Sequence, residues 1–200
     1  RIGAPVFAPS KDVADYFEKA HYKLMASPRI FPGQDVFAAV SAPGANLYIA
    51  YYGEGDEVFY VDADSVAGDA TNFALRVPEV PGPIFEVGVR LNEDVSIDLD
   101  HVGWKGNPNV TFERPKHKGL MWRRAWVDAV DQLLGWSEMF RLVQNEGLGM
   151  ISQGAREWTD YTVSADVTPH LVSRAGVAAR VQGLTRFYAL VVTREQKVQM

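Results

Sequence analysis

The sequence contains no cysteine among its 200 residues, only four histidines, and no apolar run of about 18 residues or more. The missing cysteines exclude disulfide bonds and thiolate metal sites, but many secreted bacterial β-sandwiches also lack cysteine, so the compartment stays open. Without a long apolar run we expect no membrane span, and without a basic and apolar leader we expect no signal peptide within these residues. A leader upstream of Arg1 stays an open alternative.

Charge is unevenly distributed along the chain, which carries 25 acidic and 20 basic residues in total. Residues 1–110 hold 8 Lys and Arg against 16 Asp and Glu, whereas residues 111–200 hold 12 against 9. This asymmetry favours two structural units. Because the first half is acidic and the second has no basic run, we expect no nucleic-acid partner.

The amino-terminal segment, residues 1–34, is predicted to be a helical linker or brace. Apolar residues recur at helical spacing from Ser10 to Met25, Ser10 can cap the first turn, and Pro28 lies beyond the end.

Residues 35–110 are predicted to form an all-β, jelly-roll-like unit. Turn sequences rich in glycine and proline separate the predicted strands, which are Val36–Val40, Leu47–Tyr52, Val58–Val61, Phe73–Val77, Phe85–Leu91 and Ser96–Trp104. In the last of these, Ile97 and Leu99 alternate out of phase with Val102 and Trp104, which predicts a β-bulge near His101.

Residues 115–200 are predicted to form a second, incomplete β-sandwich, separated from the first by a turn at Gly106–Pro108. The pattern of Trp122–Leu134 fits a helix or strands, and its context favours strands. Further strands are predicted at Phe140–Val143, Gly149–Ser152, Tyr161–Thr168, Ala175–Gly183 and Phe187–Thr193, and a fourth pattern begins just before Met200, which suggests truncation.

The order of several motifs resembles the carboxy-terminal region of long bacterial ADP-ribosylglycohydrolase-family proteins over roughly residues 35–200. The segments that carry the resemblance are Met121–Asp128, Phe140–Gly147, Gln153–Tyr161 and Arg180–Ala189. The resemblance implies an upstream catalytic domain in the same chain, with magnesium bound there and no cofactor bound within these residues. It also implies a galactose-binding-like first unit and a concanavalin A-like or laminin G-like second unit. The expected function is therefore a non-catalytic accessory region that binds a glycan or a partner.

Two alternatives stay open. One is a glycoside hydrolase that acts through the second sandwich, which needs two carboxylates beside one cleft; the acidic candidates there, Glu157, Asp160 and Asp166, are dispersed. The other is a structural scaffold that docks the catalytic domain. The sequence shows no HExxH pair, no GxSxG elbow and no phosphate-binding loop, so no catalytic residue is predicted.

Two groups of residues are candidate binding sites. Asp62, Asp64 and Asp69 could gather oxygen ligands for calcium, with a solvated acidic turn as the alternative. Sugar binding is expected from exposed aromatic rings beside amide and guanidinium groups, and Tyr48 and Tyr52 share strand parity opposite Tyr51. The preferred ligand-binding surface lies around the turn at 183–186, with a solvated sheet face as the alternative, and consists of Arg180, Gln182, Arg186 and Tyr188.

Overall fold

The computed structural model describes residues 21–26, 28–41, 44–66, 69–91, 97–113, 119–135, 140–156 and 158–200. Their regular structure is antiparallel β-sheet apart from one 3-10 helix, η1 (Met121–Ala125), which confirms the all-β prediction. No helix in these ranges has the length and apolar character needed to cross a membrane. The chain divides into two compact units: unit 1 is Arg1–Trp126 with Gly154–Glu157, and unit 2 is Val127–Gln153 with Trp158–Met200.

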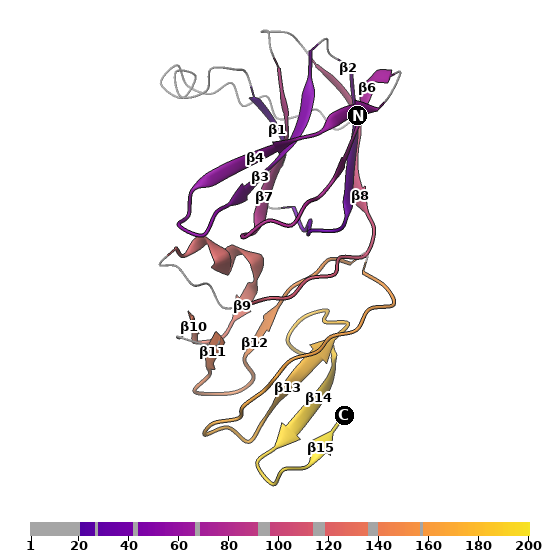
Figure 1. Ribbon diagram of the computed structural model, residues 1–200. Helices are drawn as coiled ribbons and strands as arrows, with labels where there is room; N and C mark the ends of the chain where they lie inside the picture. The colour runs from indigo at the N-terminus through magenta and orange to yellow at the C-terminus, as the bar shows by residue number, and fades with distance from the viewer. Residues whose placement is uncertain are drawn as a thin grey trace. The chain divides into compact units, whose positions relative to one another are not determined.

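Unit 1 contains two four-stranded sheets (Figure 1). The first has the order β1 (His21–Ala26), β7 (Ile84–Arg90), β3 (Asn46–Tyr52), β4 (Val58–Asp62). The second has the order β5 (Asp64–Val66), β6 (Asp69–Arg76), β2 (Asp35–Ser41), β8 (Asp98–Lys105). Six of these strands, β2, β3, β4, β6, β7 and β8, coincide closely with predicted strands, whereas β1 and β5 were not predicted as strands.

Apolar side chains from both sheets of unit 1 form one buried cluster. In β2 the alternation places Val36, Ala38 and Val40 inside, and β3 contributes Leu47 and Ile49. Two sheets that share a core through their inner faces form a sandwich. The opposite face of each sheet is therefore left for polar and aromatic side chains.

The predicted β-bulge is confirmed. The ladder between β2 and β8 pairs Ala39 with His101 and Val40 with Leu99, so Asp100 is the extra residue. Because of this insertion, Leu99 and Val102 both pack against the core although their sequence positions differ in parity.

The predicted amino-terminal helix is wrong where the structure describes it. Its last residues, from His21 on, belong to β1, which pairs antiparallel with β7; residues 1–20 lie outside the described residues. Leu24 and Met25 both pack against the core of unit 1, which is possible because the ladder shifts register between Lys23 and Met25. The segment is therefore a strand because it pairs with β7, although its apolar residues recur at helical spacing.

Unit 2 contains three small sheets among its described residues. They are the pair β9 (Val127–Ala129) and β12 (Met150–Ser152), the pair β10 (Gln132–Gly135) and β11 (Phe140–Val143), and the sheet β13 (Arg174–Ala179), β14 (Tyr188–Thr193), β15 (Val198–Gln199). The ambiguous stretch from Trp122 divides into η1 and two strands. Of the buried apolar side chains in the described part of the chain, unit 2 holds only Leu133.

The strand predicted at Tyr161–Thr168 is wrong. Residues 161–170 are exposed, and no described strand pairs with them. Apolar and polar residues do alternate there, as they do in a half-buried strand. A strand of a sheet, however, also needs a neighbouring strand with which its backbone can form hydrogen bonds.

The predicted boundary between residues 110 and 115 precedes the observed division at Trp126. The connecting segment is held on unit 1 because the Asp56 carboxylate, in the turn between β3 and β4, accepts hydrogen bonds from the backbone N–H groups of Leu120 and Met121, both at 2.8 Å. Asp56 itself has a left-handed backbone, with φ of 71°.

Candidate ligand-binding face of unit 1

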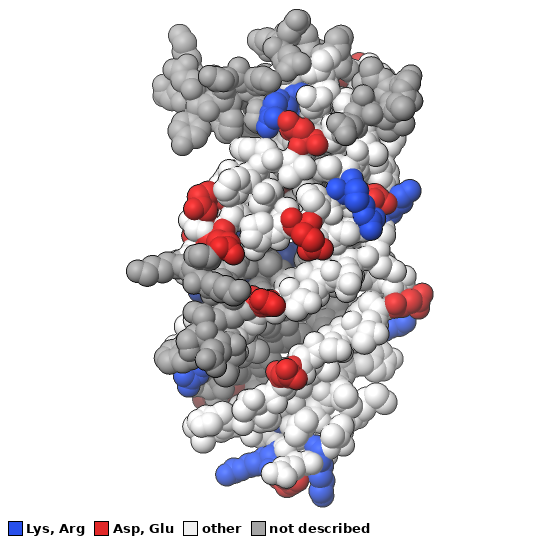
Figure 2. All heavy atoms as spheres, viewed as in Figure 1, with Lys and Arg blue, Asp and Glu red and all other residues white. Residues whose placement is uncertain are grey.

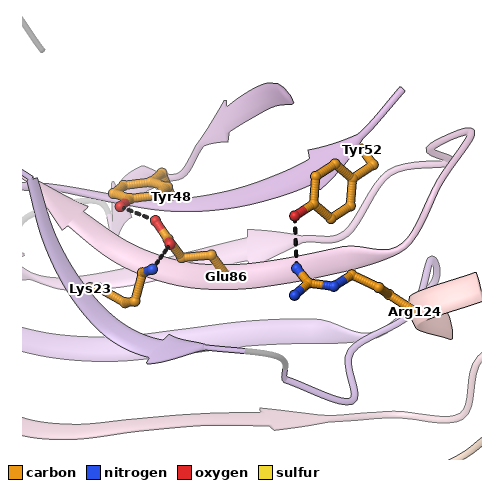
Figure 3. Close-up of polar contacts among 5 residues, drawn as sticks. All are labelled: Lys23, Tyr48, Tyr52, Glu86 and Arg124. Carbon is orange, nitrogen blue, oxygen red and sulfur yellow. Dashed lines mark hydrogen bonds and ion pairs between the residues drawn. The ribbon is translucent and has the colours of Figure 1, made fainter. Parts of the chain in front are cut away.

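The outer face of the sheet β1–β7–β3–β4 gathers aromatic and charged side chains. Tyr51 packs against the core, whereas Tyr48 and Tyr52 contact residues on the opposite face (Figure 3). The parity predicted for these tyrosines is therefore confirmed. Two clusters lie on this face, one around Tyr48 and one around Tyr52.

The first cluster is centred on the buried carboxylate of Glu86. The Tyr48 hydroxyl donates a hydrogen bond of 2.7 Å to Glu86 Oε1, and Lys23 Nζ lies 2.7 Å from Oε2 (Figure 3). A buried carboxylate is costly unless it is paired and hydrogen-bonded, and here both of its oxygens are satisfied.

A glycine makes room for the Tyr48 ring. A Cβ atom at Gly88, on the neighbouring strand, would lie only 2.3 Å from the Tyr48 hydroxyl oxygen and 2.4 Å from Cζ. Any other residue at this position would displace the ring and, with it, the hydrogen bond to Glu86.

Tyr60 and Arg90 extend this cluster towards the edge strand β4. The Tyr60 ring meets Tyr48 edge to face at 5.5 Å, and the Arg90 guanidinium lies 5.6 Å from the Tyr48 ring centroid and 2.5 Å from Asp62 Oδ2. Burial, followed by the hydrogen bond and negative charge of Glu86, raises the pKa of Tyr48 well above its ordinary value. Burial also raises the pKa of Tyr60. The cluster is a closed, mutually paired network.

The second cluster, which we call the Tyr52 ledge, consists of Tyr52, Phe85 and Arg124. The rings of Tyr52 and Phe85 stack at 4.2 Å and remain half-exposed. Arg124, on η1, donates a hydrogen bond of 2.8 Å to the Tyr52 hydroxyl, and its guanidinium lies 5.8 Å from the Tyr52 ring centroid (Figure 3). An exposed cation thus lies at the rim of an accessible aromatic pair.

The four residues of the predicted ligand-binding surface all lie on the hairpin formed by β13 and β14 in unit 2. All four are exposed, and Gln182 N–H donates to the Arg186 carbonyl at 2.8 Å across the predicted turn. The parity argument for Arg180 and Gln182 does not hold, because β13 ends at Ala179 and Arg180 has a left-handed backbone with φ of 53°. The hairpin brings these residues into one region without assigning them a common sheet face.

The three aspartates predicted as calcium ligands lie on successive strands. Asp62 ends β4, Asp64 begins β5 and Asp69 begins β6. Asp62 is paired with Arg90, so a cation already neutralises it. Within the described side chains, which exclude those of Asp64 and Asp69, no group of three or more potential metal ligands occurs.

The contacts of Lys23, Glu86 and Arg124 were not predicted from the sequence. Glu86 and Arg90 lie within the predicted strand Phe85–Leu91, but their partners lie on strands up to 63 positions away in sequence. Only the strand order and register bring them together.

Charged side chains of both signs are scattered over the face shown in Figure 2, with broad uncharged areas between them. Comparison with protein-family models, with curated proteins and with solved structures gave no match. The resemblance to ADP-ribosylglycohydrolase-family proteins therefore stays a prediction.

Proposed function

We propose that this chain is a non-catalytic recognition region that binds a neutral glycan at the Tyr52 ledge. The observation that carries the proposal is the guanidinium of Arg124 at the rim of the stacked Tyr52 and Phe85 rings. The resemblance described above supports the further proposal that the region belongs to an ADP-ribosylglycohydrolase-like hydrolase, whose catalytic domain would lie upstream.

The ledge offers the two kinds of contact that sugars need. The C–H face of a pyranose ring packs on an aromatic side chain, and its hydroxyls accept hydrogen bonds from fixed donors. A guanidinium carries several N–H donors, of which the contact with Tyr52 occupies only one. Glu54 and Glu57 lie in the turn that follows Tyr52, so an anionic sugar would meet like charges there.

The charge pairing on this face of unit 1 supports a binding role over hydrolysis at the ledge, while hydrolysis through the second sandwich stays an alternative. A glycoside hydrolase uses two carboxylates as acid and as base or nucleophile. Here Glu86 is held by Lys23 and Tyr48, and Asp62 by Arg90.

A glycan array followed by calorimetry on the best hit tests the proposal. We expect Arg124→Gln to weaken binding at least ~10-fold without lowering the melting temperature, because an exposed charge-assisted contact is lost. Arg123→Gln is the matched control, since it removes the same charge from the neighbouring exposed position of η1.

Arg180→Gln separates the ledge from the hairpin surface predicted from the sequence. Binding that survives Arg124→Gln but is lost in Arg180→Gln would move the site to the hairpin of unit 2. Absence of any glycan signal, or equal losses in Arg123→Gln and Arg124→Gln, would contradict the proposed site at the ledge.

A further inference from the structure

One face of the sheet β13–β14–β15 is entirely apolar. The ladders place Ala175 opposite Val192, Val177 opposite Leu190 and Ala179 opposite Tyr188, and Val192 is in turn opposite Val198. Side chains directly opposite each other in an antiparallel ladder lie on the same face of the sheet. We call this surface the open apolar face; it consists of Ala175, Val177, Ala179, Tyr188, Leu190, Val192 and Val198.

The large side chains of the open apolar face are exposed. Tyr188 is 68% exposed, Leu190 52% and Val198 65%. Contiguous exposed apolar patches on proteins usually mark interaction surfaces. A sheet face of this composition resembles the inner face of a β-sandwich, where a second sheet covers it.

Charge is confined to the other positions of the same strands. Arg174 pairs with Thr193, and that pair alternates with the apolar set, so its side chains point to the other face of the sheet. Arg194 and Lys197 lie in the turn between β14 and β15. The open apolar face therefore carries no charged side chain.

We propose that the open apolar face binds the same face of a second copy of this chain, so that two three-stranded sheets form one sandwich across a two-fold axis. A two-fold interface brings each residue type near itself or its symmetry partner, so the surface must be self-complementary. A charged face would oppose like charges in this arrangement, whereas an uncharged, uniformly apolar face satisfies the requirement without compensation.

Sedimentation equilibrium of the intact chain at micromolar to submillimolar concentrations tests this inference. We expect dimers, and we expect Leu190→Lys or Tyr188→Lys to weaken association at least ~10-fold, because each dimer would then bury two ammonium groups. Gln199→Lys is the matched control: it introduces the same charge in β15 beside Val198, on the opposite face of the sheet.

A second readout avoids introducing charge and uses the absence of cysteine from the sequence. In Leu190→Cys the single thiol should react with a maleimide at least ~10-fold more slowly at concentrations that favour the dimer. The thiol of Gln199→Cys should react at one rate throughout. Circular dichroism identifies any variant that fails to fold.

Three outcomes would overturn the inference. The first is a chain that stays monomeric over the whole concentration range, which would mean that the open apolar face does not bind a second copy of this chain. The second is a dimer that Leu190→Lys and Gln199→Lys weaken equally. The third is a Leu190→Cys thiol whose reactivity does not depend on protein concentration.

Discussion

At the scale of single residues, the hydrogen bond between Tyr48 and Glu86 joins two buried polar side chains of unit 1. The tyrosine is 1% exposed and the glutamate 8%, so neither has water as an alternative partner. Loss of one partner leaves the other buried and unsatisfied, which costs about 1–3 kcal/mol. Tyr48→Phe should therefore lower the free energy of unfolding by that amount at neutral pH.

The same residue predicts a pH dependence. The pKa of Tyr48 is raised in the folded state, so its contribution to stability is complete below about pH 10 and is lost as the pH rises above that value. Above pH 10 the wild-type chain should lose up to about 1.4 kcal/mol per pH unit through this group, and Tyr48→Phe should lack that component. Urea unfolding between pH 8 and 11 measures both slopes.

Equal slopes in wild type and Tyr48→Phe would contradict the prediction. Tyr60, whose pKa is also raised by burial, should account for part of the slope that remains in Tyr48→Phe.

At this scale the sequence predicted to which face of the sheet a side chain points, but not which other side chains it contacts. Strand parity separated Tyr48 and Tyr52 from Tyr51 because parity is a local property of an extended chain. It could not place Arg124 against Tyr52, since that contact joins η1 to a strand 72 positions away. The proposed glycan site therefore depends on a contact that no local pattern contains.

At the scale of elements, Asp56 forms a clamp: its carboxylate ties the backbone N–H groups of Leu120 and Met121, at the start of η1, to the turn between β3 and β4. Asp56→Ala should speed amide hydrogen exchange at Leu120 and Met121 and cost about 0.5–2 kcal/mol, as loss of a helix cap does. Asp56→Asn should cost less, because asparagine tolerates the left-handed backbone at this position and keeps one acceptor oxygen.

Glu57→Ala provides the comparison for Asp56, since the Glu57 carboxylate accepts a hydrogen bond from Gly55 N–H within the same turn. It should leave exchange at Leu120 and Met121 unchanged. If Asp56→Ala behaves like Glu57→Ala at these two amides, the clamp does not hold η1.

Element prediction was accurate where strong turn sequences bounded each strand and failed where long-range pairing decided the outcome. Six of the strands of unit 1, from β2 to β4 and from β6 to β8, and the bulge beside His101 were evident from alternation and its phase. Residues 161–168 alternate as clearly, yet they lack a neighbour among the described strands. His21–Ala26 shows the converse, because its pairing with β7 was not evident from its own residues.

At the scale of the whole molecule, the two units differ in how much apolar surface they bury. Apart from Leu133, the buried apolar side chains of the described residues all belong to unit 1. Local stability follows buried apolar contacts. At concentrations low enough to keep the chain monomeric, amides of β2, β3 and β7 should exchange at least ~10-fold more slowly than those of β13 and β14.

Hydrogen exchange with mass spectrometry on the intact chain measures this difference. Protection of β13 and β14 should then rise with protein concentration if the open apolar face associates as proposed. Equal protection of both units in the monomer would contradict the prediction that unit 1 has the higher local stability.

The bulge at Asp100 also determines what the removal of one residue from β8 would do to the core. Leu99, Val102 and Trp104 all pack against the core, and the outward positions between them hold Asp100, His101 and Gly103. Omission of Asp100 would leave inward and outward residues in strict alternation from Leu99 to Trp104. A chain shorter by this one residue would keep the same inward set, so β8 can lose a residue here without any exchange of core side chains.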